Sequence, residues 1–295
     1  MFYTVTCNPA LDYLMRADII LGKTNRSAGE TLRYGGKGIN VAVMLSRLGQ
    51  KATALGFAAG FTGCELVRLV EDSGVRADFI RLNEGLTRIN VKVQGAQETE
   101  INGAGPCVTA AAWQELLTRV DKLVSGDTLV LSGSVAGGMD TTAYAEILAR
   151  LQGRGIRTVV DATRDLLRNT LPYHPFLIKP NRQELEELAG RPLCDDEDIL
   201  AAAQQLQAAG AQNVLVSLGE RGALLLDEQG AVYRRAAIPV TVADTVGAGD
   251  SMIAGFLAGL TDGVEAALNL AVAAGSATAA ADGLATGKAV LDLVR

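Results

Sequence analysis

Short apolar runs alternate with helix-patterned stretches along most of this chain. Such alternation is typical of a parallel sheet covered by helices, because parallel strands need long crossover connections. The runs are almost continuously apolar, as expected for strands that are buried on both faces. The predicted strands lie at 2–7, 52–57, 128–131, 158–160, 176–178 and 214–217, and predicted helices at 38–48 and 64–73. The sequence therefore predicts an α/β fold with a mostly parallel central sheet.

Two segments break the alternation, around residues 13–34 and 87–101, because strand-like stretches follow one another there without a helix. Apolar and polar residues alternate in 87–93, which predicts a strand with one apolar and one polar face. A small sheet of this kind would form a lid or a dimer surface beside the main sheet. No linker separates two independent units, so residues 1–295 are predicted to form one domain that carries this lid.

Composition and charge argue against several classes of protein. The chain has 295 residues, 48% of them hydrophobic and 20% charged, which is typical of a globular protein. A net charge of −6 without a basic stripe argues against nucleic acid as a partner. The sequence shows neither a signal-peptide pattern nor an apolar run of membrane-spanning length, so we expect no membrane association and a cytoplasmic location. Four widely spaced cysteines and one histidine predict reduced thiols and no histidine-cluster metal site.

The turn at 244–250, Asp-Thr-Val-Gly-Ala-Gly-Asp, most constrains the chemistry. It follows a predicted strand at 238–242 and precedes a helical stretch. Gly247 and Gly249 allow close backbone approach, and the free amides and dipole of a helix start attract an anion such as phosphate. Asp250 would then remove a proton from a hydroxyl that attacks the phosphorus. The alternative is a glycine-rich turn in which Asp250 is only the helix N-cap.

A second glycine-rich helix start lies at 35–42, Gly-Gly-Lys-Gly-Ile-Asn-Val-Ala. It is not a Walker A loop, because neither Ser nor Thr follows Lys37. Helix-start amides beside a lysine suit a phosphorylated or multiply hydroxylated ligand, and the alternative is a tight turn that packs the helix on the sheet. Asp12, just after the first strand, could accept hydrogen bonds from sugar hydroxyls or cap a turn.

Two further turns follow predicted strands, at 179–185 and 217–223. In the first, Asn181 and Glu184 have the spacing of a capping box. They could instead meet magnesium or its waters, because that ion prefers oxygen ligands and keeps several waters. The second turn, Ser-Leu-Gly-Glu-Arg-Gly-Ala, could cradle nucleotide phosphate or ribose, or only connect two elements. Together, such turns at strand ends point to one site.

These motifs resemble those of the ribokinase-like, or phosphofructokinase B, family of sugar kinases over essentially the whole chain. The turn at 244–250 matches the family's second signature, [DN]-T-x-G-A-G-D, without departure. The runs at 35–42, 179–185 and 217–225 occur in the family's order and spacing.

Within the family, the nearest likeness is to the bacterial 1-phosphofructokinase group. It rests on the opening at 6–12 and on the lid runs at 87–92 and 100–103. The run Ser-Gly-Ser at 132–134 also resembles that group, although Val and Ala at 135–136 replace the usual Leu-Pro.

The resemblance implies a ribokinase-like three-layer α/β/α sandwich with a mostly parallel central sheet and a small β lid, through which members often form homodimers. It implies a phosphotransferase that uses ATP and Mg²⁺ and, as in some members, a monovalent cation such as K⁺. The implied substrate is fructose 1-phosphate, which would give fructose 1,6-bisphosphate. The alternatives are a tagatose-6-phosphate kinase that gives tagatose 1,6-bisphosphate and a catalytically idle sugar-phosphate sensor on the same fold.

The resemblance also implies roles for individual positions. Asp250 would be the general base, and the amides of Gly247, Ala248, Gly249 and Asp250 would form the anion hole. The substrate-binding residues would be Asp12, Gly35, Gly36, Lys37, Gly38, Asn40 and Arg88, with Lys37 and Arg88 on the phosphate that the substrate already carries. The residues that serve ATP would be Lys179, Asn181, Ser217, Gly219 and Gly222. Glu184 would hold magnesium, directly or through water, and Asp244 and Val246 would hold the monovalent cation.

Overall fold

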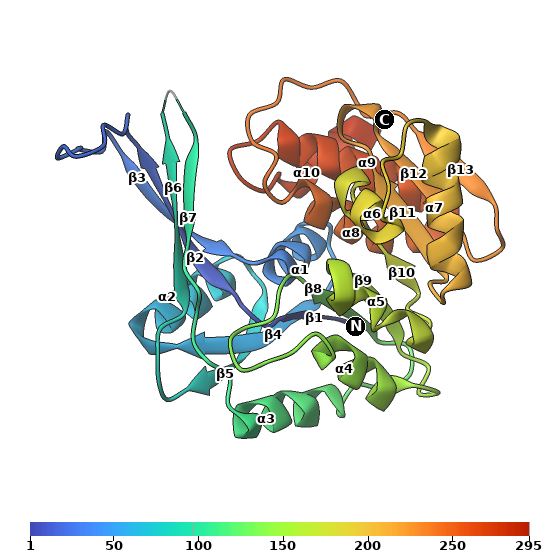
Figure 1. The fold of residues 1–295 in the computed structure, drawn as a ribbon, viewed down its shortest axis with the longest axis horizontal. Coiled ribbons are helices and arrows are strands. Elements are labelled where there is room, and N and C mark those ends of the chain that lie inside the picture. Colours follow the sequence, from blue (N-terminus) through green and yellow to red (C-terminus); the bar gives the residue numbers. More distant parts are fainter. Residues whose placement is uncertain (96, 295) are drawn as a thin grey trace.

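The computed structural model describes residues 1–95 and 97–294, and these form three layers (Figure 1). The strands of the central sheet are β1 (Phe2–Thr6), β4 (Ala52–Ala59), β5 (Arg76–Leu82), β8 (Thr128–Ser132), β9 (Arg157–Asp161), β10 (Leu177–Ile178), β11 (Asn213–Ser217), β12 (Ala223–Leu226) and β13 (Val232–Arg235). Among the described residues this sheet is nine-stranded, in the order β13-β12-β11-β10-β9-β8-β1-β4-β5. The strands from β11 to β5 are parallel, whereas β12 and β13 continue the sheet antiparallel. The predicted, mostly parallel sheet is confirmed.

Apolar side chains from both faces of this sheet enter two separate cores. On β8, Leu129 and Leu131 point to one face and Val130 to the other, and all three are fully buried. The first face is covered by α3 (Ala110–Val120), α4 (Ala143–Leu151), α5 (Arg164–Arg168), α6 (Arg182–Ala189) and α7 (Asp196–Ala208). The second is covered by α1 (Lys37–Arg47), α2 (Gly60–Asp72), α8 (Ala248–Gly259), α9 (Val264–Ala279) and α10 (Gly287–Val294). Double burial explains the continuously apolar strands.

A smaller sheet stands away from the central sheet (Figure 1). Its strands are β2 (Ala10–Arg16), β3 (Glu30–Gly35), β6 (Arg88–Gln94) and β7 (Thr99–Asn102), in the order β3-β2-β6-β7. These strands overlap the two segments expected to form the lid. The register places Asp12 opposite both Arg33 and Asn90, so the three side chains share one face of this sheet.

The prediction of a strand at 238–242 is wrong, because this segment has no regular secondary structure. Pro239 has no amide hydrogen for a ladder, and the amide of Ile238 donates to Ser276 Oγ at 3.3 Å. The segment instead lines a cavity beside α8 and α9.

The expectations about membrane spans and thiols can be compared with the structure directly. Across the described residues, none of the helices combines the length and the apolar character required to cross a bilayer. All four cysteines, Cys7, Cys64, Cys107 and Cys194, are free thiols.

Candidate active site

The carboxyl ends of the parallel strands meet at a cavity of about 600 Å³. Residues that follow β1, β8, β9, β10 and β11 line its floor, and residues of β2 and β6 line the lid side. An open α/β sheet leaves its ligand crevice at this edge. The predicted residues gathered here are Asp12, Gly36, Lys37, Asn40, Arg88, Lys179, Asn181, Glu184, Ser217, Val246, Gly247, Gly249 and Asp250.

Asp250 lies in the first turn of α8, with its side chain buried. Because α8 begins at Ala248 and Gly247 is its N-cap, the alternative that Asp250 is the N-cap is wrong. Asn40 Nδ2 donates to Asp250 Oδ2 at 2.8 Å. Burial, and after it the charge of Asp161, raises the pKa of Asp250 to about 6, against the opposing effects of Asn40 and two lysines. A carboxylate with this pKa is suited to accept a proton near neutral pH.

The start of α8 brings helix-start backbone and a buried lysine next to this carboxylate. Gly247 has a φ of 79°, a left-handed conformation that glycine adopts without strain. A Cβ atom at position 249 would lie 3.0 Å from Lys179 Nζ, so the absence of a side chain at Gly249 lets the buried lysine approach the helix start. Helix-start amides and an ammonium group therefore converge, which favours a bound anion.

Asp161, at the end of β9, is a site residue that our sequence interpretation missed. Its side chain is 1% exposed and lies between two lysines, with Lys37 Nζ 3.3 Å from Oδ2 and Lys179 Nζ 3.7 Å from Oδ1. Neither oxygen has a hydrogen-bond partner among the residues that the structure describes. Buried oxygens with unused lone pairs suit a hard cation or its waters. Its position directly after a predicted strand was the available signal, the same one that singled out Asp12.

Lys37, at the start of α1, faces the same group of charges. Its Nζ also lies 3.8 Å from Glu184 Oε1. Burial disfavours the charged lysine, but the carboxylates of Asp161, Asp250 and Glu184 outweigh burial and raise the pKa of Lys37. The side chain is therefore a permanent cation beside the start of α8.

Asn181 and Glu184 form the capping box that the spacing predicts. Asn181 Oδ1 accepts from the Glu184 amide at 2.8 Å, and the Asn181 amide donates to Glu184 Oε2 at 2.9 Å. The other oxygen of Glu184, Oε1, faces Lys37. One carboxylate can thus cap α6 and present an oxygen to the cavity, so the two interpretations are compatible.

The glycines at 35–38 serve mainly to allow close packing. A Cβ atom at Gly38 would lie 2.5 Å from Thr6 Oγ1, so this glycine lets α1 pack closely against β1. A Cβ atom at Gly35 would lie 2.6 Å from Asp12 Oδ1, so the carboxylate of Asp12 rests against the bare backbone of β3. The packing alternative therefore applies to Gly35 and Gly38, whereas Gly36 and Lys37 between them line the cavity.

Arg88 and Asp12 form the lid side of the cavity. Arg88 Nε donates to the carbonyl oxygen of Asn8 at 3.1 Å. Within the described part of the chain its other guanidinium donors have no partner, so they are available to a ligand. Burial lowers the pKa of this half-buried arginine, and Asp12 opposes that effect. Asp12 Oδ1 accepts from Asn90 Nδ2 at 2.9 Å, and Asn90 was not singled out from the sequence.

A second cavity, of about 660 Å³, adjoins the first one at Asn181, Ser217 and Gly249. The turn after β11, which contains the short helical turn η2 (Gly219–Arg221), lines one side of it. Gly222 has a φ of 88°, and a Cβ atom there would lie 2.0 Å from the Arg235 carbonyl oxygen, so only glycine fits. The remaining wall is largely apolar and comes from 237–242, α8 and α9. A flat, apolar group such as a nucleobase suits this cavity.

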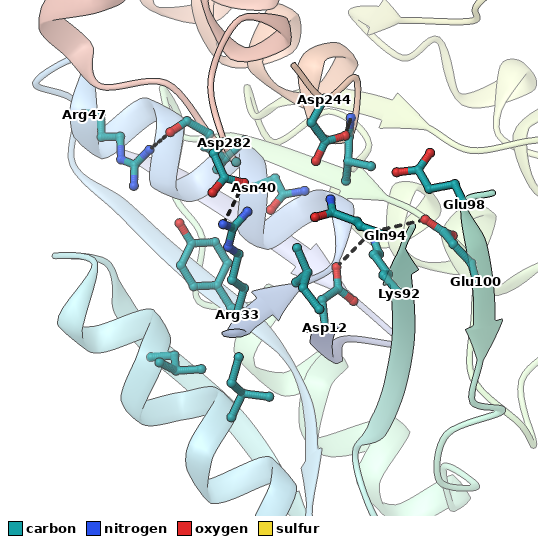
Figure 2. Close-up of a pocket in the computed structure, with 17 residues that line it drawn as sticks. Asp12, Arg33, Asn40, Arg47, Lys92, Gln94, Glu98, Glu100, Asp244 and Asp282 are labelled. Carbon is teal, nitrogen blue, oxygen red and sulfur yellow. Dashed lines mark hydrogen bonds and ion pairs between the residues drawn. The ribbon is translucent and has the colours of Figure 1, made fainter. Parts of the chain in front are cut away.

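A third, smaller cavity of about 220 Å³ lies between the lid and the C-terminal part of the chain (Figure 2). Asp244 and Val246 line it, and the Val246 amide donates to Asp244 Oδ1 at 2.9 Å. Across it, Arg33 of the lid pairs with Asp282 at 2.9 Å (Figure 2). The predicted cation ligands therefore lie beside the contact between lid and core.

Comparisons with known proteins show the family of this chain. The family described as pfkB family carbohydrate kinase matches residues 7–289. The chain is 37% identical to 1-phosphofructokinase of Bacillus subtilis (strain 168), over 100% of this chain and 97% of that protein. It is 36% identical to D-tagatose-1-phosphate kinase of Bacillus licheniformis, over 96% and 94% of the two chains. The crystal structure of phosphofructokinase-2 from Escherichia coli with substrates and products superimposes with a TM-score of 0.94 at 31% identity, over 99% and 98% of the chains.

These matches confirm the predicted ribokinase-like fold and the predicted class of enzyme, a phosphotransferase that acts on an alcohol group. The chain belongs to the pfkB family of carbohydrate kinases.

Proposed function

We propose that this kinase transfers a phosphoryl group from ATP to fructose 1-phosphate and so forms fructose 1,6-bisphosphate. The observation that carries the proposal is the buried Asp250 carboxylate at the start of α8, across the same cavity from Arg88. In this arrangement a proton acceptor (Asp250), a helix start that attracts an anion (α8) and the cationic side chain of Arg88 would surround one ligand. The similarity to 1-phosphofructokinases over the full length supports this substrate.

In this proposal, Asp250 removes the proton of the acceptor hydroxyl as its oxygen attacks the phosphorus. The amides of Gly247, Gly249 and Asp250 and the ammonium groups of Lys37 and Lys179 stabilise the negative charge that spreads over the phosphoryl oxygens, whereas the Ala248 amide donates to the Thr245 carbonyl oxygen at 3.2 Å. Asn40 holds the Asp250 carboxylate through the bond at 2.8 Å and so keeps its free oxygen directed at the acceptor. The resemblance implied that Lys37 binds the phosphate that the substrate already carries. We infer instead that it acts on the transferred group, because its ammonium lies beside Asp161 and Glu184.

The lid side of the cavity would bind the sugar phosphate. Arg88 would pair with the phosphate that the substrate already carries, since its terminal donors bond to none of the described residues and suit a planar, charge-assisted contact. Asp12, Gly36 and Asn40 would hold the sugar hydroxyls.

ATP would occupy the second cavity, with its base against the apolar wall and its phosphates toward Lys179 and Gly249. Ser217, Gly219 and Gly222 line the entry to that wall, and Gly222 allows the tight turn. Magnesium, when bound, would neutralise charge on the nucleotide phosphates, and Asp161 and Glu184 are the residues that would hold the ion or its waters. Asp244 and Val246 remain the proposed ligands of a monovalent cation.

We also infer a homodimer formed through the lid. Val91 is paired with Ile101 across β6 and β7, and Ile89 shares their face of the sheet. Ile101 is 63% exposed and Ile89 39% exposed, which leaves an apolar face uncovered in one chain.

A tagatose phosphate is the second candidate substrate, because a D-tagatose-1-phosphate kinase is as similar as several 1-phosphofructokinases. Tagatose 6-phosphate also stays an alternative. A catalytically idle sensor is less favoured, since ligand binding alone does not require a buried carboxylate with a raised pKa.

The first experiment compares ADP release with fructose 1-phosphate, fructose 6-phosphate, tagatose 1-phosphate and tagatose 6-phosphate in the presence of Mg²⁺. We expect the highest kcat/KM with fructose 1-phosphate, and loss of turnover when Mg²⁺ is chelated. Replacing K⁺ by Na⁺ tests the monovalent-cation site. We expect turnover to be higher with K⁺ than with Na⁺. A preference for a tagatose phosphate would show that the proposed substrate is wrong. Inactivity with all four compounds would favour the catalytically idle sensor.

Asp250→Asn should lower kcat by at least about 100-fold, because the substitution removes the proton acceptor, whereas the new side chain can still accept a hydrogen bond from Asn40.

The Asp250→Asn variant should also be more stable than the unmodified protein at about pH 8. Because the folded-state pKa of Asp250 is raised, its ionised form destabilises the fold above about pH 6, and this effect vanishes as the pH falls below the ordinary aspartate pKa. The expected gain is on the order of 2 kcal/mol and should be visible in Tm.

The exposed Asp262, in the short helical turn η3 (Leu260–Asp262) that follows α8, provides the control. Asp262→Asn should change neither kcat nor the pH dependence of Tm. Normal turnover of Asp250→Asn would remove Asp250 from the proposed mechanism.

Arg88→Ala should raise KM for the sugar phosphate about 10- to 100-fold with a smaller change in kcat, because it deletes a charge-assisted contact to the substrate. Steady-state kinetics with ATP saturating would measure this. The exposed Arg81 on β5 is the matched control, and Arg81→Ala should leave KM unchanged. An unchanged KM in Arg88→Ala would contradict the assignment.

Light scattering after gel filtration should give twice the chain mass of 30.8 kDa for the unmodified protein. Ile101→Asp should give the monomer mass, because a charge in the apolar face cannot be buried without a partner. Val124 is 64% exposed and lies outside the lid, so Val124→Asp should stay dimeric. A monomeric unmodified protein would disprove the lid dimer.

A further inference from the structure

Lys92 is a charged lid residue to which the proposed reaction assigns no task. It lies on β6 on the same face as Arg88 and Asn90, and it lines both the 600 Å³ cavity and the smaller cavity beside it. Its side chain is only 15% exposed. Burying a lysine costs free energy unless its charge is compensated, so its partners indicate what it does.

Those partners are two carboxylates on the neighbouring strands. Lys92 Nζ lies 3.3 Å from Asp12 Oδ2 and 3.6 Å from Glu100 Oε1, and Figure 2 shows it between the two. Asp12 is 13% exposed and Glu100 45% exposed, so the contact with Asp12 is the sheltered one. It is also the contact at the edge of the sugar-binding cavity.

The Asp12 carboxylate is held from three directions. Asn90 Nδ2 donates to Oδ1 at 2.9 Å, and Lys92 holds Oδ2. Behind it, a Cβ atom at Gly35 would lie 2.6 Å from Oδ1 and 3.0 Å from Oδ2, so the group rests against bare backbone. An ionised carboxylate accepts about four hydrogen bonds, so its remaining lone pairs are available in fixed directions.

We propose that Lys92 is a positioning residue that fixes Asp12, so that the Asp12 carboxylate distinguishes ketohexose 1-phosphates that differ in the configuration of one ring hydroxyl. The proposal rests on the proposed function, and it adds the residue pair that sets substrate preference. A hydroxyl of the right configuration meets a lone pair held in place, whereas its epimer leaves that acceptor without a partner. A carboxylate that can rotate would follow either hydroxyl and lose the distinction.

Lys92 also offsets the charge of Asp12, which would otherwise repel a substrate phosphate in the same cavity. This charge effect is equal for two epimeric phosphates, because both carry the same charge. It therefore cancels in the ratio of their kcat/KM values. The ratio isolates the positioning role from the general electrostatic one.

The experiment measures kcat/KM for fructose 1-phosphate and tagatose 1-phosphate in the unmodified enzyme and in Lys92→Met. We expect the unmodified enzyme to prefer fructose 1-phosphate, and Lys92→Met to reduce that preference at least about fivefold, with most of the change in KM. Lys92→Arg, which can still donate to Asp12 Oδ2, should restore most of the preference. Thermal unfolding of each variant verifies that it is folded.

Glu100→Gln is the matched control, because it removes the negative charge of the other partner of Lys92 and keeps the contact with Asp12. We expect it to leave the preference unchanged. An equal rise in KM for both epimers in Lys92→Met, with the ratio preserved, would overturn the positioning role and leave only a charge effect. A loss of preference in Glu100→Gln as large as in Lys92→Met would also overturn it, because a general loosening of the lid would then be sufficient.

These outcomes are separable from a failure of the proposed function. If the unmodified enzyme phosphorylates neither compound, the proposed substrate class is wrong and the inference fails with it. If it is active but shows no preference between the epimers, the proposed kinase activity stands and only the role of Lys92 is overturned.

Discussion

Charge balance at the carboxyl edge of the central sheet is the constraint on which the rest of this structure depends. Asp161 and Asp250 are both buried there, and the charge of Asp161 adds to the burial that raises the pKa of Asp250. Lys37 and Lys179 offset this repulsion from distances of 3.3 and 3.7 Å to Asp161. Asp250 keeps a raised pKa, and neither oxygen of Asp161 has a hydrogen-bond partner among the described residues. In the proposed function, a phosphate and a cation would complete this charge balance.

The fold gathers these four side chains from separate elements. Asp161 and Lys179 follow neighbouring parallel strands, whereas Lys37 and Asp250 lie in the first turns of α1 and α8. Parallel strands end at the same edge, and the helices that return across the sheet begin there, so helix-start amides and strand-end side chains meet in one place. The chemistry is therefore a consequence of topology as well as of residue type.

The lid contributes the other half of the cavity, and its polar face is built for a different purpose. The Asp12 carboxylate on β2 contacts both Asn90 and Lys92 on β6, and the backbone of Gly35 lies behind it. Such a rigid group suits the recognition of hydroxyl configuration, whereas the core side suits the stabilisation of charge. In the proposed function, recognition and charge stabilisation are divided between two sheets, which would allow substrate preference to change without altering the start of α8.

The sequence by itself determined the α/β class, the lid segments and the turn that contains Asp250, because periodicity and glycine placement are local properties. It also predicted a strand at 238–242 that does not form, since an apolar run can line a cavity as well as enter a sheet. Only the tertiary structure decided that Asp161 joins the site and that Lys92 holds Asp12. Both depend on contacts between elements that are distant in sequence, and a position after a predicted strand does not say which side chains of other elements it will face.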